Sequence, residues 1–341
     1  MTIPPVHLPV LLEETIRHLR VRRGGRYIDC TTGLGGHSTA IAQAMGEDGR
    51  LLCIDQDREA LEFARTKLTP FGRRVSFVHG NFRELATMAA AEGFEGVDGI
   101  VMDLGVSSMQ FDRPERGFAF GSEGPLDMRM DRASDGLTAA DIVNTWDETS
   151  LANLFYVYGE ERQSRRIAAS VVRARPLATT WDLARAVEQA VGGTRGRNQI
   201  HPATRVFLAL RIRINGELDS LETALPQAHR LLGFGPASSS NNQTAPDEEL
   251  LGGRLAVISF HSLEDRIVKH YFRRESTNCI CPPELPVCRC GHVATLREVV
   301  HRAIRPSEAE VARNPRARSA VLRIAERLAE PAASHASPRG A

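Results

Sequence analysis

Short apolar runs alternate with amphipathic segments along the first hundred residues of the chain. Each run has the length of a strand and is bounded by polar or glycine-containing turns. The segments between the runs repeat apolar residues at helical spacing: Ala40, Ile41, Ala44 and Met45 in one, Leu61, Ala64 and Leu68 in the next. This alternation predicts a parallel α/β sheet with helices on both faces. The predicted strands cover residues 26–30, 50–55, 74–78 and 97–103.

The alternation stops after Asp103. Residues 112–216 read as a loop followed by several helices, without a convincing strand, which predicts an inserted all-helical domain. One of its helices is expected to begin at the N-cap Thr180 and to end at Gly192 and Gly193. Its apolar stripe would comprise Leu183, Val187, Ala190 and Val191.

The α/β pattern resumes beyond the insertion. A long helix is expected to end near Leu232, and an apolar strand follows at residues 254–260 after a Gly252-Gly253 turn. A last pair of strands is predicted at 296–302 and 319–325. The predicted organisation is a discontinuous sheet domain of residues 1–111 and 217–328, the insertion at 112–216, a polar loop at 238–249 and a flexible tail at 329–341.

Composition limits the class of protein. The 341 residues are 42% hydrophobic and 25% charged, which is enough apolar material for one large domain or two smaller ones. No uninterrupted apolar run approaches the roughly 20 residues of a membrane helix, and residues 1–10 lack the features of a signal peptide. We therefore expect a soluble, cytoplasmic protein with reduced thiols.

The formal net charge of +1 predicts no particular partner, but the basic residues are unusual. Lys67 and Lys269 are the only lysines, and arginine supplies the rest. Arginine suits phosphate recognition, although a genome-wide coding bias would enrich it as well. Between residues 159 and 215, eleven arginines stand against four acidic residues. This local excess favours an RNA-binding insertion, and the alternative is a solvated face paired with Glu160 and Glu161.

Residues 27–38 run from a strand through a glycine-rich loop into a helix. Glycine lets the backbone turn sharply and approach a ligand closely, and the first N–H groups of the helix remain free for an anionic group. Gly33, Gly35 and Ser38 nearly form a dinucleotide fingerprint. A purely structural strand-to-helix turn remains an alternative for this loop.

Acidic residues near the ends of the strands refine the choice of cofactor. Asp55 follows the loop at the spacing that suits a ribose, which fits NAD and S-adenosylmethionine equally. Asp29 precedes the glycines, Asn81 and Phe82 follow the third strand, and Asp103 ends the fourth. A carboxylate at the mouth of the loop would repel a pyrophosphate, so this set favours S-adenosylmethionine over NAD.

Longer motifs carry a family resemblance over nearly the whole chain. They include MDLGVSS at 102–108, GPLDMRMD at 124–131 and SFHSLEDR at 259–266. The further matches are His7 with residues 10–12, and residues 33–37, 116–118, 158–162, 201–205 and 314–319. With these motifs in this order, the chain resembles the bacterial 16S ribosomal RNA (cytosine-N4) methyltransferases.

The resemblance implies a doubly wound, mostly parallel, seven-stranded Rossmann-like methyltransferase sheet with an inserted helical domain. It implies transfer of a methyl group from S-adenosylmethionine to the N4 amine of a cytidine in the decoding centre of 16S rRNA in the small ribosomal subunit. The cofactor contacts that it implies are Gly35, Gly36, His37, Asp55, Phe82, Asp103 and Gln110. His37 could instead cap or pack, and Phe82 could belong to the core.

The methyl-transfer site departs from the common pattern of amino-methyltransferases. Many amino-methyltransferases carry an aromatic residue after the fourth strand that stacks on the base, whereas this chain has Val106 there. Phe118 or Phe120 would have to serve instead. We expect Asp103, Ser107 and His261 to be catalytic, although Ser107 could simply form a turn and His261 could be buried and satisfied.

Four cysteines crowd into a proline-rich stretch, as Cys279-x-Cys281 and Cys288-x-Cys290. Four thiolates could form a structural zinc site, while free thiols or a redox-labile loop remain alternatives, because zinc modules more often have two residues within each pair. Catalysis requires no metal.

Two other functions remain open at this stage. A nicotinamide-dependent dehydrogenase would explain the loop and Asp55 but lacks a hydride-transfer constellation. A ribosome-assembly factor would bind RNA without turnover. The sequence does not fix the oligomeric state, and a homodimer is possible.

Overall fold

The fold was analysed in a computed structural model of the chain, which describes residues 9–192, 201–236, 250–282, 284–285 and 287–329. Contacts divide the chain into two compact units. Unit 1 comprises residues 1–55, 63–104 and 222–341, and unit 2 comprises 56–62 and 105–221. The predicted insertion, 112–216, falls within unit 2. His7, Arg195, Arg197, the polar loop at 238–249 and nearly all of the tail lie outside the described residues.

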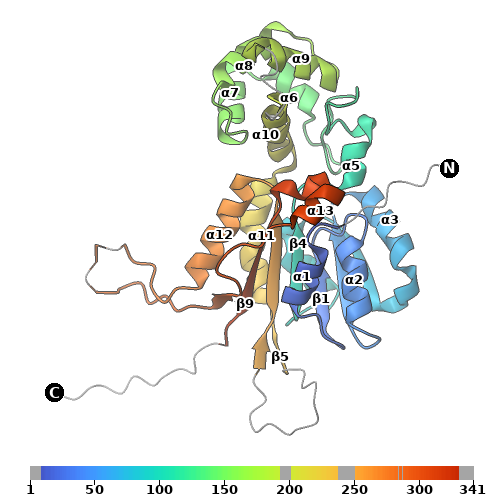
Figure 1. The fold of residues 1–341 in the computed structure, drawn as a ribbon, viewed down its shortest axis with the longest axis vertical. Coiled ribbons are helices and arrows are strands. Elements are labelled where there is room, and N and C mark those ends of the chain that lie inside the picture. The colour runs from blue at the N-terminus through green and yellow to red at the C-terminus, as the bar shows by residue number, and fades with distance from the viewer. Residues whose placement is uncertain (1–8, 193–200, 237–249, 283, 286, 330–341) are drawn as a thin grey trace. The chain divides into compact units, whose positions relative to one another are not determined.

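A seven-stranded sheet forms the centre of unit 1 (Figure 1). Its strand order is β3-β2-β1-β4-β7-β9-β8, and the first five strands are parallel to one another. β9 pairs antiparallel with both β7 and β8. The predicted fold class is therefore confirmed. The strands are β1 (Arg26–Asp29), β2 (Arg50–Asp55), β3 (Val75–His79), β4 (Gly99–Asp103), β7 (Arg254–Ser259), β8 (Leu296–Glu298) and β9 (Val321–Arg327).

The central strands are continuous apolar runs that are buried on both faces, as a parallel sheet covered by helices requires. Tyr27, Leu51 and Val101 belong to one buried cluster, together with Leu19 of α1 and Ile41 of α2. α12 contacts β7, β8 and β9. The helices assigned wholly or largely to unit 1 are α1 (Leu12–Leu19), α2 (Gly36–Ala44), α3 (Arg58–Leu68), α4 (Leu85–Ala91), α11 (Glu217–Leu231), α12 (Ser262–Glu275) and α13 (Glu308–Arg313).

Unit 2 is built from helices around a core of its own. Leu151, Phe155, Ile167, Leu183 and Leu210 are buried in that core. Its described residues contain no strand, in agreement with the pattern of the sequence. The helices are α5 (Ser108–Asp112), α6 (Ala139–Thr145), α7 (Glu148–Val157), α8 (Ser164–Arg173), α9 (Thr180–Val191) and α10 (Ala203–Asn215).

The N-cap of α9 differs from the prediction by one residue. Thr179 caps the helix by accepting the N–H of Asp182, whose carboxylate in turn accepts the N–H of Thr179. Thr180 is the first helical residue, and its hydroxyl instead bonds the backbone of Ser122 and Gly124. Adjacent threonines have equal capping propensity, so tertiary contacts decide between them.

Two further details of the pattern are corrected. The helix α2 buries His37 and Ser38 besides Ile41 and Met45, whereas Ala40 and Ala44 are only partly buried. The sequence also gave no sign of a short antiparallel pair, β5 (Phe234–Pro236) with β6 (Leu250–Gly252). Among the helices of the described residues, none combines the length and apolar character required to cross a membrane.

Candidate functional site

Three carboxylates mark one edge of the sheet in unit 1. Asp29, Asp55 and Asp103 are the last residues of β1, β2 and β4. These strands are parallel, so their carboxyl ends meet at the same edge, which is where doubly wound sheets bind ligands. The predicted positions of Asp55 and Asp103 at strand ends are therefore confirmed, and Asp29, expected within the first strand, is its last residue.

The glycine-rich loop connects β1 to α2 along this edge. The Gly33 N–H donates to Asp55 Oδ2 over 2.6 Å, so the loop is tied to the end of β2. Gly35 has φ of 73°, and a Cβ there would lie 3.3 Å from the Cβ of Ala64. A Cβ on Gly36 would lie 2.9 Å from Pro9. The turn and its packing therefore account for both Gly35 and Gly36, and their predicted contact with the cofactor stays a prediction.

Asp29 is enclosed beneath the loop, with 1% of its surface exposed. The Ser38 hydroxyl donates to its Oδ2 over 2.6 Å, and the Thr31 N–H donates to its Oδ1 over 3.1 Å. Burial nevertheless raises the pKa of Asp29 to about 6, because these bonds offset only part of the desolvation of the charge. A cation beside Asp29 would restore the charged form.

His37 joins the N-terminal segment to Asp103. Its Nε2 lies 3.1 Å from the carbonyl oxygen of Val10, and its Nδ1 lies 3.6 Å from Asp103 Oδ2. The ring is 5% exposed, so it packs, as the alternative interpretation of the sequence held. We infer that His37 orients the Asp103 carboxylate, while a direct contact with the cofactor remains untested.

Asp103 has an unsatisfied oxygen. The backbone N–H of Asp103 donates to Thr31 Oγ1 over 2.6 Å, but its enclosed Oδ1 has no hydrogen-bond partner among the described residues. Burial and then the charges of Asp29 and Glu264 raise the pKa of Asp103 well above its usual range. A buried polar atom without a partner is uncommon in a native fold, and here it points to a ligand.

His261 lies just beyond the end of the neighbouring strand, β7, at the N-cap of α12. Its side chain is 10% exposed, and Nε2 lies 3.2 Å from Glu264 Oε1. Its Nδ1 has no hydrogen-bond partner among the described residues. The catalytic role of His261 and the alternative that it is simply buried and satisfied both remain predictions.

Phe82 follows β3 at the start of a short 3-10 helix, Phe82–Glu84. Its side chain is half-buried, so it retains a surface that an adenine could contact. Asn81 caps this turn by accepting the Arg83 N–H over 2.9 Å. Phe82 is therefore not a fully buried core residue.

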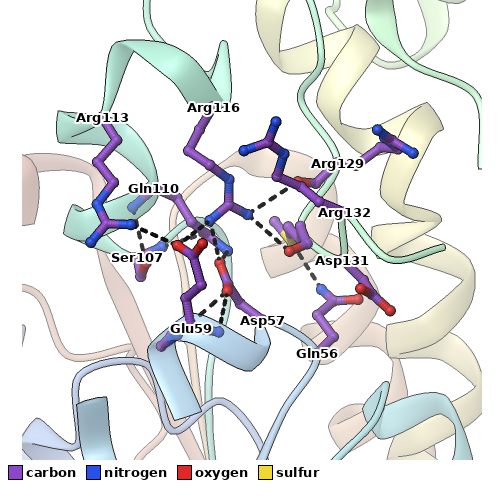
Figure 2. A network of polar contacts seen from close by, with 12 residues as sticks. Gln56, Asp57, Glu59, Ser107, Gln110, Arg113, Arg116, Arg129, Asp131 and Arg132 are labelled. Carbon is purple, nitrogen blue, oxygen red and sulfur yellow. Dashed lines mark hydrogen bonds and ion pairs between the residues drawn. The ribbon is translucent and has the colours of Figure 1, made fainter. Parts of the chain in front are cut away.

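Unit 2 contains a buried polar network that the sequence analysis did not identify (Figure 2). Arg116 Nη1 donates to Asp57 Oδ2 over 2.8 Å, and both side chains are almost fully buried. Gln110 Nε2 donates to the same oxygen over 2.8 Å. Arg116 Nη2 donates to the carbonyl oxygens of Arg129 and Met130. The network fixes the start of α3 against α5 and the 128–130 segment.

This network changes the interpretation of Gln110 and Ser107. Gln110 Oε1 accepts the Ser107 N–H over 2.9 Å, and the Ser107 hydroxyl accepts the Gln110 N–H over 3.3 Å. Both ends of the buried Gln110 amide are thus bonded within the protein, which argues against the predicted contact with the cofactor. Ser107 is the N-cap of α5, as the turn-forming alternative held.

Asp57 and Arg116 could have been noticed in the sequence. Asp57 stands two residues after Asp55, and Arg116 opens one of the motifs that carry the family resemblance. A charged residue is rarely buried without a partner, but the sequence does not show which charges are buried. The pairing across 59 positions required the structure.

The two candidates for stacking on a base differ in burial. Phe118 is 6% exposed and belongs to the core of unit 2, and Phe120 packs against His201 and Phe207 with ring centroids 4.7 and 5.1 Å apart. Val106 packs against the same core. The buried Phe118 offers no open face for a cytosine, whereas Phe120 is half-buried and its predicted stacking role stays a prediction.

The arginines of α8, α10 and the loops beside them differ in how far the fold uses them. Arg211 pairs with Glu217 through two bonds of 2.8 Å, Arg175 donates to backbone carbonyls, and Arg205 lies 3.5 Å from Glu161. These three are used in the fold. Four arginines in or just before α8 are exposed and have no ion pair among the described residues: Arg162, Arg165, Arg166 and Arg173. We call this group the α8 arginine face.

The carboxylate edge of unit 1 fits a cationic cofactor. S-adenosylmethionine carries positive charge on its sulfonium and ammonium groups, which three carboxylates would stabilise, whereas a pyrophosphate would be repelled. The Asp103 Oδ1 supplies an acceptor, and a cation beside Asp29 and Asp103 would offset the burial that raises the pKa of both carboxyl groups. When bound, the cofactor would supply an electrophilic methyl group.

Comparison with known proteins agrees with this site. A model of the MraW methylase family matches residues 5–328. A protein called ribosomal RNA small subunit methyltransferase H from Dehalococcoides mccartyi is 51% identical over 95% of this chain and 87% of its own length. Proteins of the same name from Thermomicrobium roseum and Symbiobacterium thermophilum are 51% and 48% identical, covering 95% and 94% of this chain and 94% and 96% of their own lengths. The chain belongs to the MraW methylase family, whose methyl donor is S-adenosylmethionine.

Proposed function

We propose that this methyltransferase methylates the exocyclic N4 amine of a specific cytidine in the decoding centre of 16S rRNA, within the small ribosomal subunit. The observation that carries the proposal is the 51% sequence identity, over 95% of this chain, with relatives named ribosomal RNA small subunit methyltransferase H. The choice of cytosine N4 rests on the motifs quoted above. Such a substrate would place the activity in the cytoplasm.

The chemistry of the amine sets the task of the protein. The lone pair of cytosine N4 is delocalised into the ring, so the amine is a weak nucleophile and must be held by acceptors in line with the methyl group. Asp103 Oδ1 is such an acceptor, because it is enclosed and has no partner among the described residues. Positioning and charge placement would therefore supply most of the rate enhancement.

A proton must leave the nitrogen after it is methylated. The raised pKa of Asp103 makes its carboxylate a better proton acceptor than an ordinary aspartate. His37, 3.6 Å from Oδ2, would hold this carboxylate in place. His261 offers a second buried acceptor or donor at the adjacent strand end.

The target base must also reach the site. A stacked cytosine in folded RNA has to be splayed from its neighbours, unless the ribosomal subunit already presents it unstacked. The α8 arginine face would contribute phosphate contacts that hold the RNA while this occurs. We propose unit 2 as the main RNA-binding part of the chain.

The test is nucleoside mass spectrometry of 16S rRNA from cells that lack this protein. We expect N4-methylcytidine to be missing from the decoding centre and to return on expression of the wild-type chain. Asp103→Asn should restore little of it, whereas Asp48→Asn, which alters an exposed carboxylate between α2 and β2, should restore it fully. An unchanged level of N4-methylcytidine in the deletion strain would overturn the assignment.

A methyl-transfer assay on purified small subunits separates the methyltransferase from an assembly factor. An assembly factor would bind the subunit without methylating it, so the wild-type chain would transfer no methyl group to purified subunits at saturating cofactor. Wild-type turnover in Asp103→Asn would instead remove Asp103 from the methyl-transfer site while leaving the substrate assignment intact.

A further inference from the structure

The segment between α12 and β8 is poorly explained by packing. In Figure 1 it runs out from the end of α12 and returns to β8, coloured orange. None of its described residues from 277 to 294 is buried or lies in a helix or strand. Ile280, Val287 and Val293 expose 43%, 67% and 46% of their surfaces. A segment of this length without a core needs another source of order.

Four cysteine side chains converge within this segment. The Sγ atoms of Cys279, Cys281, Cys288 and Cys290 all lie within 4.8 Å of one another. The Cys288 and Cys290 sulfurs are 3.5 Å apart, and those of Cys279 and Cys290 are 4.0 Å apart. A disulfide would require about 2.0 Å, and all four cysteines are free.

These separations have the size of a tetrahedral metal site. Zinc–thiolate bonds of about 2.3 Å at tetrahedral angles place neighbouring sulfurs about 3.8 Å apart. The two distances given above lie on either side of this value. Four sulfurs at van der Waals contact, with no bond between them, gain little from one another unless a cation lies among them.

Backbone donors surround the sulfurs. The N–H groups of Ile280 and His292 donate to Cys290 Sγ over 3.4 and 3.5 Å, and the Arg289 N–H donates to Cys281 Sγ over 3.4 Å. Such N–H to sulfur bonds stabilise the negative charge of thiolate ligands and orient them. They are a second observation that favours metal ligands over an accidental gathering of thiols.

The base of the segment is bonded to the end of α12. The His292 side chain takes part in this bonding and so does not belong to the cysteine cluster. The His292 Nε2 lies 2.9 Å from the Arg274 carbonyl oxygen near the end of α12. Asn278 Oδ1 accepts the Ala294 N–H, and the Thr295 N–H donates to the Glu275 carbonyl oxygen over 2.9 Å. The outgoing and returning ends of the segment are thus tied to each other at its base, which helps to bring the four thiols to one place.

We propose that Cys279, Cys281, Cys288 and Cys290 bind one zinc ion as four thiolates. Each thiol releases its proton on binding. Four protein ligands fill every position of a tetrahedral site, so the ion has no open position for water or substrate and acts as a structural clamp. The clamp would hold the segment between α12 and β8 in place of a hydrophobic core.

Metal analysis of the full-length, untagged protein, purified under reducing conditions, tests the proposal. We expect one zinc ion per chain, released by an organomercurial that blocks thiols. Replacement by Co²⁺ should give the absorption bands of a tetrahedral tetrathiolate site. Zinc loss should also make the segment between α12 and β8 more sensitive to limited proteolysis.

Substitutions distinguish the proposed zinc ligands from other residues of the same segment. Cys288→Ser and Cys281→Ser should each lose most of the bound zinc. Val287→Ser, which changes an exposed residue of the same segment, and His292→Ala should retain it. The proposal is overturned if the wild-type protein, dialysed against Zn²⁺ under reducing conditions, holds well below one ion per chain with four reactive thiols. The proposal is also overturned if both cysteine variants retain zinc, or if the four cysteines form two disulfides in wild-type protein purified under reducing conditions.

Discussion

At the scale of single residues, the carboxylates at the sheet edge lie in an environment that disfavours their charge. Asp29 is almost fully buried, Asp103 is half-buried with an enclosed Oδ1, and Asp29 is one of the charges that raise the pKa of Asp103. Buried acids of this kind destabilise a fold unless a partner compensates for them, and they are typical of binding sites. We therefore expect the carboxylates at this edge to lower the stability of the fold without cofactor and to favour binding of a cation.

The variant Asp29→Asn tests how the Asp29 charge affects stability and cofactor binding. The folded-state pKa of Asp29 is about 6, against an ordinary value of 3.8, so between these pH values the folded chain holds more protons than the unfolded chain. Its contribution to stability therefore falls as pH rises through this window. Asparagine keeps the acceptor for Ser38 but does not titrate. We expect the variant without cofactor to be more stable than wild type above pH 6, by about 1–3 kcal/mol, and no more stable near pH 4.

The measurements are urea unfolding across this pH range and titration with S-adenosylhomocysteine and S-adenosylmethionine. We expect Asp29→Asn to bind both more weakly than wild type at neutral pH, because it lacks the negative charge beside the ligand. Asp48→Asn, with an exposed carboxylate between α2 and β2, should change neither property. A parallel pH profile for Asp29→Asn and wild type would contradict the assigned titration.

The sequence predicted the acidic residues of the site better than its neutral ones. Strand-end position is a property of the local pattern, so Asp29, Asp55 and Asp103 were found directly. The roles of Gln110 and Phe118 depend on which partners surround a side chain after folding. Gln110 is bonded to Ser107 and Asp57, and Phe118 lies in a core. Motif resemblance identifies such residues without showing whether they touch a ligand.

At the scale of elements, the buried Asp57–Arg116 pair links segments that are distant in the sequence. Arg116 is 2% exposed, and its guanidinium bonds the start of α3 and the 129–130 backbone (Figure 2). Breaking a buried ion pair by removing one partner leaves an uncompensated charge, which typically costs about 3–5 kcal/mol. An exposed pair contributes about 0–1 kcal/mol.

Arg116→Met should therefore be far more destabilising than Arg113→Met. Arg113 pairs with Glu59 over 2.6 Å, but both side chains are about half exposed, at 44% and 54%. We expect a loss of about 3–5 kcal/mol for Arg116→Met and at most about 1 kcal/mol for the control. Adding Asp57→Asn to Arg116→Met should recover part of the loss, because it removes the isolated charge.

Denaturant unfolding of the three variants checks this prediction, with circular dichroism to confirm that each folds. Equal losses for Arg116→Met and Arg113→Met would show that burial does not decide the strength of these pairs. A double variant less stable than Arg116→Met alone would show that Asp57 is held mainly by Gln110 and by the N–H of Glu59.

The element pattern was predicted well where one periodicity extends over several turns or strands. The seven main strands and the helices of unit 2 follow from alternation and from helical stripes. The β5–β6 pair was missed because each strand has three residues, too few for a period. The cap of α9 was misplaced because Thr179 and Thr180 are chemically equivalent until Gly124 and Ser122 bond one of them.

At the scale of the whole molecule, we propose that one unit binds the cofactor and the other binds RNA. Unit 1 carries the carboxylate edge for the cofactor, and unit 2 carries the α8 arginine face. A net charge of +1 conceals this division, because the arginine excess is local. The electrostatic part of RNA binding should therefore be separable from cofactor binding.

Neutralising three arginines of α8 tests this separation. Each phosphate contact that is lost should reduce the slope of log affinity against log salt by about 0.7–0.9. We expect the triple variant Arg165→Gln, Arg166→Gln and Arg173→Gln to bind small-subunit RNA more weakly at low salt and with a shallower salt slope than wild type. Its affinity for S-adenosylhomocysteine should not change, because the carboxylate edge belongs to unit 1.

A charge-matched control distinguishes contact from net charge. Arg17, Arg23 and Arg73 are exposed in unit 1, in α1 and before the amino ends of β1 and β3, so replacing them with glutamine removes the same charge away from α8. If the α8 arginine face contacts phosphates, the control keeps the wild-type salt slope. If both triple variants lose slope equally, binding follows the net charge of the chain. An unchanged slope in the α8 variant would instead mean that other residues contact the RNA backbone. Every contact that neutralises a phosphate releases counterions and therefore contributes to the dependence of affinity on salt.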